Sequence, residues 1–218
     1  MLVGQTFIRH ARSGNCVVSC VFGTASTVLT CVESGDPSRG DGALEAILAQ
    51  GMNNVNLMES GSPQKLAERL DMSLRTEARK DHPTWLFFAA VLLKPSVIEV
   101  AVAGSFRVHL VREEALVATT HDHILKEEDT SPSLLPPGFG ELREVMTSVP
   151  TRSLGGKLTL PPEVAAWEVT GPSSLGLCST DFHRYSQPTS YLGLLGPSHP
   201  GRIAQHSQDG LVAVIKIE

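Results

Sequence analysis

The sequence predicts an α+β fold in which helices pack on antiparallel sheets. Two observations lead to this class. Short β-branched and apolar runs recur along the chain, and the turns between many of them are too tight for the crossover that parallel strands need. Helical patterns are confined to the first half of the chain. With 218 residues and 41% hydrophobic content, we expect one domain, over residues 1–218.

The first third of the chain contains two predicted strands and a short predicted helix. The strands are expected at 16–22 and 27–33, joined by a G-T-A-S turn that favours antiparallel pairing. A glycine-rich loop follows, and then A-L-E-A-I-L-A at 43–49 predicts the short helix.

A second, amphipathic helix is expected to begin at Ser62. This residue is a good N-cap, and Pro63 suits the first helical position. We expect the helix to end at His82-Pro83 and to cover a core. Its apolar positions share one face: Leu66, Ala67, Leu70, Leu74 and Ala78.

The rest of the chain is predicted to be mostly strands. The expected strands are 85–93, 96–104, 106–112, 115–119, 165–169, 174–179 and 211–217. Tight turns are expected at Lys94-Pro95, at Gly104 and at Glu113-Glu114. Residues 127–150 are polar and rich in proline, which indicates a surface loop or flap.

Composition excludes several classes of function. A net charge of -5 disfavours nucleic acid as a partner, because a phosphate-backbone binder needs a basic face. No apolar run approaches the roughly 20 residues of a membrane span, and no signal-peptide pattern opens the chain. The four cysteines contain no C-x-x-C, so we expect reduced cysteines in a cytoplasmic protein.

Familiar catalytic motifs are missing. L-G-G-K-L-T-L at 154–160 lacks the spacing of a phosphate-binding loop, and no G-x-S-x-G nucleophile elbow occurs. His121 and His123 would share a face of a strand, which leaves two interpretations open. They could ligate a metal, although no third ligand is near in sequence, or they could be surface or supporting histidines.

Seven stretches together resemble the metal-dependent Ser/Thr protein phosphatases of type 2C. That family shows, in order, R-x-x-N-x-D, D-G-x-G-G, V-G-D-S-R, T-x-D-H, L-G-G, L-C-S-D-G-L and D-N-x-T. The corresponding stretches here are R-S-G-N-C-V (12–17), T-C-V-E-S-G-D (30–36), A-G-S-F-R (103–107), T-H-D-H (120–123), L-G-G (154–156), L-C-S-T-D-F (177–182) and D-G-L-V-A-V-I-K-I (209–217). The resemblance implies a four-layer αββα sandwich of two antiparallel sheets with outer helices.

The same resemblance implies a metal site whose ligand positions have changed. Members hold two divalent cations with carboxylates at one end of the sandwich, because hard cations need oxygen ligands. Here Val17 and Thr180 stand where members have aspartates, and Ser105 replaces a third. The aspartate of D-G-x-G-G falls on Glu33 or on Ser34, depending on the register. The acids that remain are Glu33, Asp181 and Asp209.

Two further residues have alternative interpretations. Asp181 occupies the glycine position of S-D-G, so it is either a helix cap or a rebuilt metal ligand. Arg12 matches the arginine that contacts the substrate phosphate in active members, and is a candidate phosphate-binding residue. Its alternative is a solvated or salt-bridged arginine. The resemblance assigns structural roles to Arg107 and to the turn residues Thr120, Asp122 and His123.

From the lost acids we expect a pseudophosphatase: a regulatory protein-binding module with no catalytic residues, no metal and no cofactor. Its expected partner is a Ser/Thr kinase or a phosphoprotein. One alternative is a divergent, active phosphatase that uses Glu33, Asp181 and Asp209 with Mn²⁺ or Mg²⁺ in a reduced metal site. Another is a structural or oligomerisation module that offers strands 85–118 as an edge, or the 127–150 loop as an arm.

Overall fold

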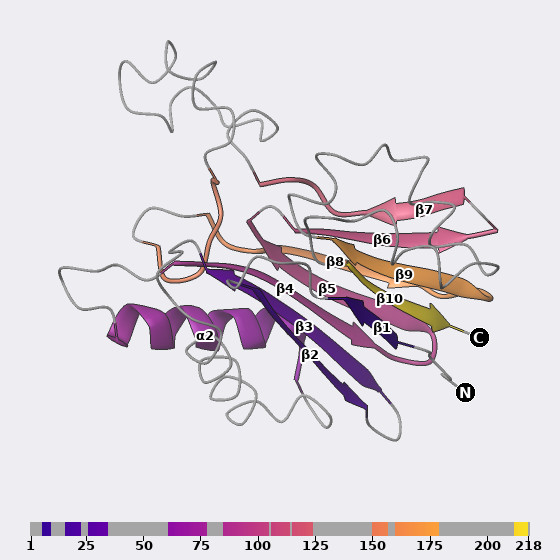
Figure 1. The fold of residues 1–218 in the computed structure, drawn as a ribbon, viewed down its shortest axis with the longest axis horizontal. Coiled ribbons are helices and arrows are strands. Elements are labelled where there is room, and N and C mark those ends of the chain that lie inside the picture. The colour runs from indigo at the N-terminus through magenta and orange to yellow at the C-terminus, as the bar shows by residue number, and fades with distance from the viewer. Residues whose placement is uncertain are drawn as a thin grey trace, which may run out of the picture.

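The computed structural model describes two five-stranded antiparallel sheets and one helix (Figure 1). It covers residues 6–9, 16–22, 26–34, 61–77, 85–104, 106–113, 115–123, 150–156, 160–178 and 212–217. The elements are β1 (Thr6–Arg9), β2 (Cys16–Phe22), β3 (Thr27–Ser34), α2 (Pro63–Glu77), β4 (Leu86–Leu93), β5 (Val97–Ala103), β6 (Arg107–Arg112), β7 (Ala115–Thr119), β8 (Glu163–Glu168), β9 (Ser173–Cys178) and β10 (Val212–Ile217).

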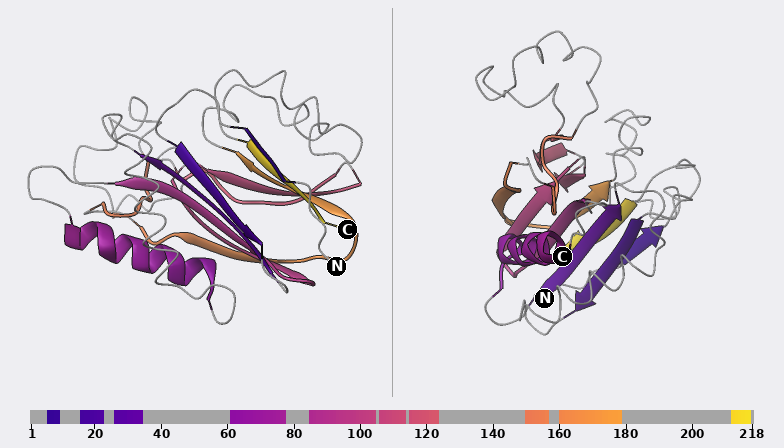
Figure 2. Two further views of the ribbon diagram at one scale, coloured as in Figure 1. Left: turned by 60° about the horizontal axis from the view of Figure 1, so that its bottom comes forward. Right: turned by 90° about the vertical axis from the view of Figure 1, so that its left-hand side faces the viewer.

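The two sheets face each other, and α2 lies on the outer face of one of them (Figure 2). One sheet has the strand order β1-β10-β9-β6-β7 and the other β2-β3-β4-β5-β8. One hydrophobic core fills the space between the sheets, and a second lies between α2 and the β2–β8 sheet. Strand β3 serves both cores because its side chains alternate: Leu29 and Cys31 belong to the first, Val28 and Val32 to the second.

The amphipathic helix forms where the sequence predicts it. The Ser62 hydroxyl accepts a hydrogen bond from the Lys65 amide at 3.3 Å, as an N-cap does. Four of the predicted apolar positions are buried, each with no more than 2% of its surface exposed: Leu66, Ala67, Leu70 and Leu74. Ala78, the expected end of the helix and the expected short helix at 43–49 lie outside the described residues.

Two features of the sheets go beyond the sequence prediction. The strand β1 was not predicted, and it pairs with β10 at an edge of its sheet. The turn at Gly104 was expected between consecutive strands, but it carries the chain from one sheet to the other, because β5 and β6 belong to different sheets. This crossing turn connects the two sheets at one end of the sandwich.

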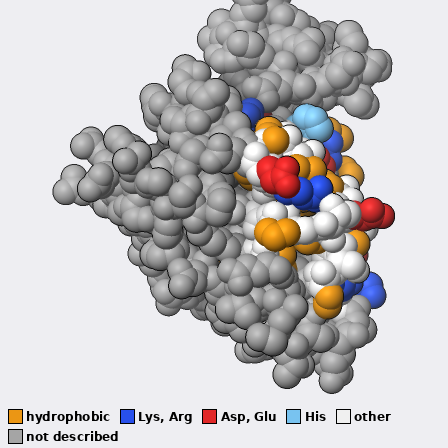
Figure 3. Space-filling view, turned by 90° about the vertical axis from the view of Figure 1, so that its right-hand side faces the viewer, with side chains coloured by type: hydrophobic (Ala, Val, Ile, Leu, Met, Phe, Trp, Pro, Cys, Tyr) orange, Lys and Arg blue, Asp and Glu red, His pale blue; other side chains and the backbone are white. Residues whose placement is uncertain are grey.

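The opposite end of the sandwich carries the β4–β5 and β6–β7 hairpins and is seen in Figure 3. Its hydrophobic side chains lie in small groups among charged and other side chains. Among the described residues, no helix is long and apolar enough to cross a membrane.

Candidate functional site

The strand register brings most of the motif positions to one end of the sandwich. In the first sheet, the pairs Arg9–Val212, Val212–Cys178 and Cys178–Arg107 form a row across four strands. In the second sheet, Glu33 is paired with Cys16 on one side and with Phe87 on the other. Because short connections join β1 to β2 and β5 to β6, the two rows lie at the same end, which we call the motif end.

Glu33 is the residual acid whose side chain the structure describes. It follows Leu29 and Cys31 at intervals of two along β3, so it lies on the face directed at the opposite sheet. Its side chain is partly buried. A carboxylate in this position stands between the sheets at the motif end, where the resemblance places the metal ligands.

The remaining candidate residues lie largely outside the described part of the chain. Arg12, Thr180, Asp181 and Asp209 fall in undescribed segments, as does Ser105. Val17 and Ser34 are placed by their backbones alone, opposite Val32 and Leu86 respectively. Of the expected 127–150 loop, only position 150 is described.

A partly buried ion pair joins β6 to the segment after β7. The Arg107 guanidinium donates from Nε and Nη2 to the two oxygens of Asp122, both at 2.6 Å. The Asp122 side chain is only 7% exposed. Thr120, two residues earlier, accepts from the Val108 amide through its hydroxyl. The structural roles that the resemblance assigns to these residues agree with this geometry.

A second polar contact joins the same segment to β8. The His123 ring, which is buried, contacts Glu163 Oε2 from Nε2 at 2.8 Å, while His121 contacts Oε1 from Nδ1 at 3.3 Å. Burial of Glu163 raises its pKa, but hydrogen bonds from His123 and from the His121 backbone and ring outweigh it and lower the pKa to about 2. The ionised Glu163 carboxylate therefore links the segment after β7 to β8 through its contacts with His121 and His123.

These contacts explain the paired histidines that the sequence left open. Both histidines share the Glu163 carboxylate, and the acid between them, Asp122, is held by Arg107. In the described part of the chain, no cluster of three or more His, Cys, Asp or Glu side chains could hold a metal ion. The geometry favours a supporting role for both histidines.

The thiol of Cys178, at the end of β9, is not suited to nucleophilic or ligand chemistry. Burial raises its pKa to about 12, although the nearby Arg107 charge lowers it. Cys31 is also buried and free. Both described cysteines fit the expectation of reduced core residues.

Gly104 shapes the crossing turn at the motif end. Its φ of +98° lies in the left-handed region, and a Cβ there would stand 2.1 Å from Phe87 Cδ1. Its carbonyl also accepts a hydrogen bond from the His123 amide at 3.2 Å. The sequence predicted a turn here, but it did not predict the contact between His123 and Glu163, which are 40 positions apart. No local pattern marks such a pair.

Comparison with solved structures identifies the class of fold. No protein-family model and no curated protein sequence matches this chain. Its structure nevertheless superposes on the serine/threonine phosphatase Stp1 from Staphylococcus aureus with a TM-score of 0.75 and 13% identity, covering 100% of this chain and 95% of that one. The serine/threonine phosphatase of S. agalactiae superposes with a TM-score of 0.70 and 12% identity, and 99% of each chain is covered.

A third similar structure contains metal. The catalytic domain of the phosphatase PstP, in complex with two manganese ions, superposes with a TM-score of 0.64 and 16% identity, covering 100% of this chain and 97% of that one. The chain therefore has the fold of bacterial Ser/Thr phosphatases. This is the type 2C phosphatase fold, and it confirms the predicted sandwich of two antiparallel sheets.

The comparisons contradict two expectations drawn from the lost acids. A domain that is not an enzyme was expected, but all three similar structures are phosphatases. No cofactor was expected, but one of these structures holds two manganese ions. The expectations were wrong because they counted acids position by position along the motifs. A cation site requires oxygen ligands at one place in the fold, and several positions can supply them.

Proposed function

We propose that this protein is a divergent metal-dependent Ser/Thr protein phosphatase with a reduced metal site. The observation that carries the proposal is the similarity of fold over the whole chain to three Ser/Thr phosphatases, one of them in complex with two manganese ions. Fold similarity alone does not determine chemistry, so the residues at the motif end must supply a suitable set of ligands.

The proposed ligands are Glu33, Asp181 and Asp209. Glu33 lies on the inner face at the motif end. Asp181 follows the last residue of β9 by three positions and Asp209 precedes the first residue of β10 by three. Those two strand ends, Cys178 and Val212, are register partners. Carboxylates are the ligands that Mn²⁺ and Mg²⁺ prefer, so this set fits a divalent cation.

The reaction is hydrolysis of a phosphomonoester. Water adds to phosphorus, the bond between phosphorus and the Ser or Thr oxygen breaks, and the products are inorganic phosphate and the free hydroxyl. A bound divalent cation supplies Lewis acidity and lowers the pKa of water. We assign Arg12 to phosphate binding, because a planar guanidinium suits two phosphate oxygens.

The proposal defines the partner as well. A Ser/Thr phosphatase acts on phosphoproteins, so we propose a phosphoprotein rather than a nucleic acid as partner. The whole chain acts as one domain, with residues 127–150 as its flap. A cytoplasmic location remains a prediction from the sequence.

The test is release of inorganic phosphate from a phosphothreonine peptide. We expect turnover with Mn²⁺, none with excess EDTA, and a loss of about 100-fold or more for Glu33→Gln, which keeps the shape of the side chain and removes its charge. Glu168→Gln is the matched control, because Glu168 is an exposed acid at the opposite end of the sandwich. Absence of turnover at every metal concentration, with a folded protein, would refute the proposal.

A further inference from the structure

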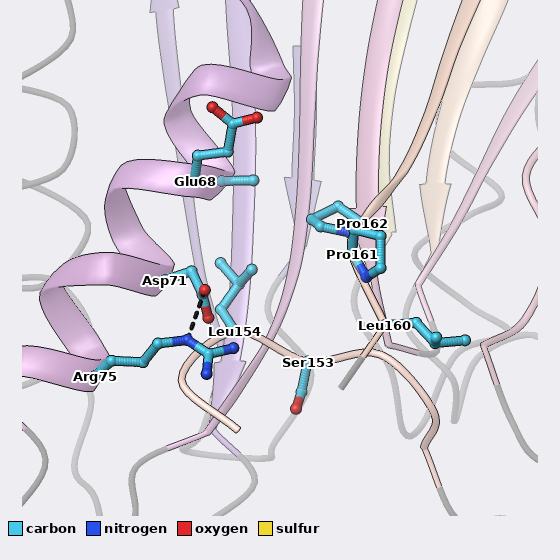
Figure 4. A pocket seen from close by; sticks show the side chains of 9 residues that line it. Glu68, Asp71, Arg75, Ser153, Leu154, Leu160, Pro161 and Pro162 are labelled. Carbon is cyan, nitrogen blue, oxygen red and sulfur yellow. Dashed lines mark hydrogen bonds and ion pairs between the residues drawn. The ribbon is translucent and has the colours of Figure 1, made fainter. Parts of the chain in front are cut away.

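A pocket lies outside the motif end, between α2 and residues 153–154 and 160–162 (Figure 4). It has a volume of about 270 Å³. Ligand pockets usually measure about 300–1,000 Å³, so this one suits a single long side chain better than a whole small molecule. Its lining residues are Ala67, Glu68, Asp71, Arg75, Ser153, Leu154, Leu160, Pro161 and Pro162.

The two walls of the pocket differ in character. The wall opposite the helix is apolar apart from Ser153, with Pro161 and Pro162 facing α2 across the opening (Figure 4). The helix wall carries three charged residues spaced about one turn apart, at positions 68, 71 and 75. Such a pocket can hold an aliphatic chain against one wall and a charged head against the other.

The charges on the helix wall do not cancel. Asp71 is fully engaged: Oδ2 accepts from Arg75 Nε and Oδ1 accepts from the Gly155 amide, each at 2.7 Å. This pair neutralises Arg75. Glu68 accepts from the uncharged Gln64 amide, and no described cation pairs with it. Among the lining residues, the charges therefore sum to one net negative charge, at Glu68, while Arg152 at the edge donates to the Pro161 carbonyl.

The pocket is within reach of the motif end. Leu154, in its lining, forms a backbone bridge with Leu86, and Leu86 pairs with Ser34 at the end of β3. Neighbouring strands lie about 4.8 Å apart, so the pocket begins about 10 Å from Ser34. An extended peptide advances about 3.3 Å per residue, so three or four residues cover this distance.

We propose that the pocket between α2 and residues 153–154 and 160–162 binds a long basic side chain, Lys or Arg, of the substrate polypeptide. This side chain lies three or four positions from the phosphorylated residue. Its aliphatic stem packs on the two prolines, and its cation pairs with Glu68. The proposal rests on the proposed function for its substrate, whereas the pocket itself can be tested without turnover.

The first experiment measures binding of capped amino acids by amide NMR shifts. We expect acetyl-arginine methylamide to shift the amides of Glu68, Asp71 and Gly155 saturably. Its uncharged analogue, acetyl-citrulline methylamide, should bind at least fivefold more weakly. Glu68→Gln should weaken arginine binding at least fivefold and leave citrulline binding unchanged, while Glu168→Gln should leave both unchanged. Equal binding of the two compounds, or no shifts at these amides, would overturn the proposal.

The second experiment uses phosphothreonine peptides in which one arginine is moved through the flanking positions. We expect kcat/KM to peak with arginine three or four residues from the phosphothreonine on one side, and Glu68→Gln to remove the peak without reducing turnover of the arginine-free peptide. A flat profile with normal turnover would refute the basic-residue pocket and leave the phosphatase proposal standing. Loss of all turnover with intact arginine binding would refute only the phosphatase.

Discussion

Two groups of acids differ in how they relate to the fold and to the proposed metal site. On the side of β6 and β8, Asp122 is held by Arg107 and Glu163 by two histidines. The second group is Glu33, on β3, together with Asp181, three positions after β9 in the sequence, and Asp209, three positions before β10. The first group is held by side chains of the protein itself and supports the fold. We assign the second group to a cation from solution.

The comparison teaches that counting acids in a motif is a poor guide to their role. Asp122 belongs to the T-H-D-H motif, but both of its oxygens accept hydrogen bonds from the Arg107 guanidinium. Its charge is therefore balanced within the protein rather than by a metal ion. Glu163 belongs to no motif and completes the same network. The role of an acid follows from its partners, which only the structure shows.

The largest expected effect concerns Asp181, whose two interpretations make opposite predictions. Asparagine caps a helix as well as aspartate does, so a capping residue would tolerate Asp181→Asn with little change. A metal ligand would not tolerate this change, because it removes a charged oxygen ligand. We predict that Asp181→Asn lowers the rate of phosphate release by about 100-fold or more. Activity within about threefold of the parent would assign Asp181 to a cap.

The next effect concerns the partly buried ion pair of Arg107 and Asp122. Asp122→Ala removes the buried carboxylate that two Arg107 nitrogens contact, and we expect a loss of about 3 kcal/mol in the free energy of unfolding, measured in urea. The control is Arg75→Ala, which breaks a pair whose side chains are 45% and 29% exposed. Exposed pairs contribute little, so this change should cost below about 1 kcal/mol. Equal losses would remove the distinction between the two pairs.

A smaller effect is expected at the crossing turn. Gly104→Ala forces a side chain into the left-handed region and against Phe87, and should destabilise by about 2 kcal/mol. Gly171→Ala is the matched control, because a Cβ there meets nothing within 4 Å and should change stability by no more than about 0.5 kcal/mol. If both variants lose the same free energy of unfolding, the turn does not require glycine at position 104.

The last effect depends on pH and involves Glu163. Its pKa is lowered from 4.5 to about 2 in the folded protein, so the stability it contributes is complete above pH 4.5 and is lost as the pH falls toward 2. Urea unfolding of the parent at several pH values should show this loss. Glu163→Gln should be less stable at neutral pH and should lack that part of the acid dependence. Identical curves for parent and variant would contradict the assignment.

The sequence was sufficient for most elements of the fold because their signals are local. The run at 86–93 is apolar and bounded by proline on both sides, and the helix from Pro63 has both a cap and a buried face. The strand β1 was not predicted because its four residues, T-F-I-R, are too few to show the two-residue alternation of a strand. It is defined by its pairing with β10, which is distant in sequence.

The candidate site was less predictable. The order of the motifs indicated a site at one end of the sandwich, but the sequence could not decide whether position 33 or 34 faces the opposite sheet. The alternation of Leu29 and Cys31 along β3 assigns Glu33 to that face. The turn at Gly104 was visible as a glycine, yet a hairpin and a crossing between sheets need the same local residues, so its role required the tertiary fold.

The central claim, that this fold still holds a divalent cation through its residual acids, is tested most directly by calorimetric titration with Mn²⁺. The account predicts saturable binding in the micromolar range by the parent chain and binding at least about 100-fold weaker by Asp209→Asn, since each carboxylate offsets part of the cation charge. No heat of binding up to millimolar Mn²⁺, with a folded parent chain, would contradict it.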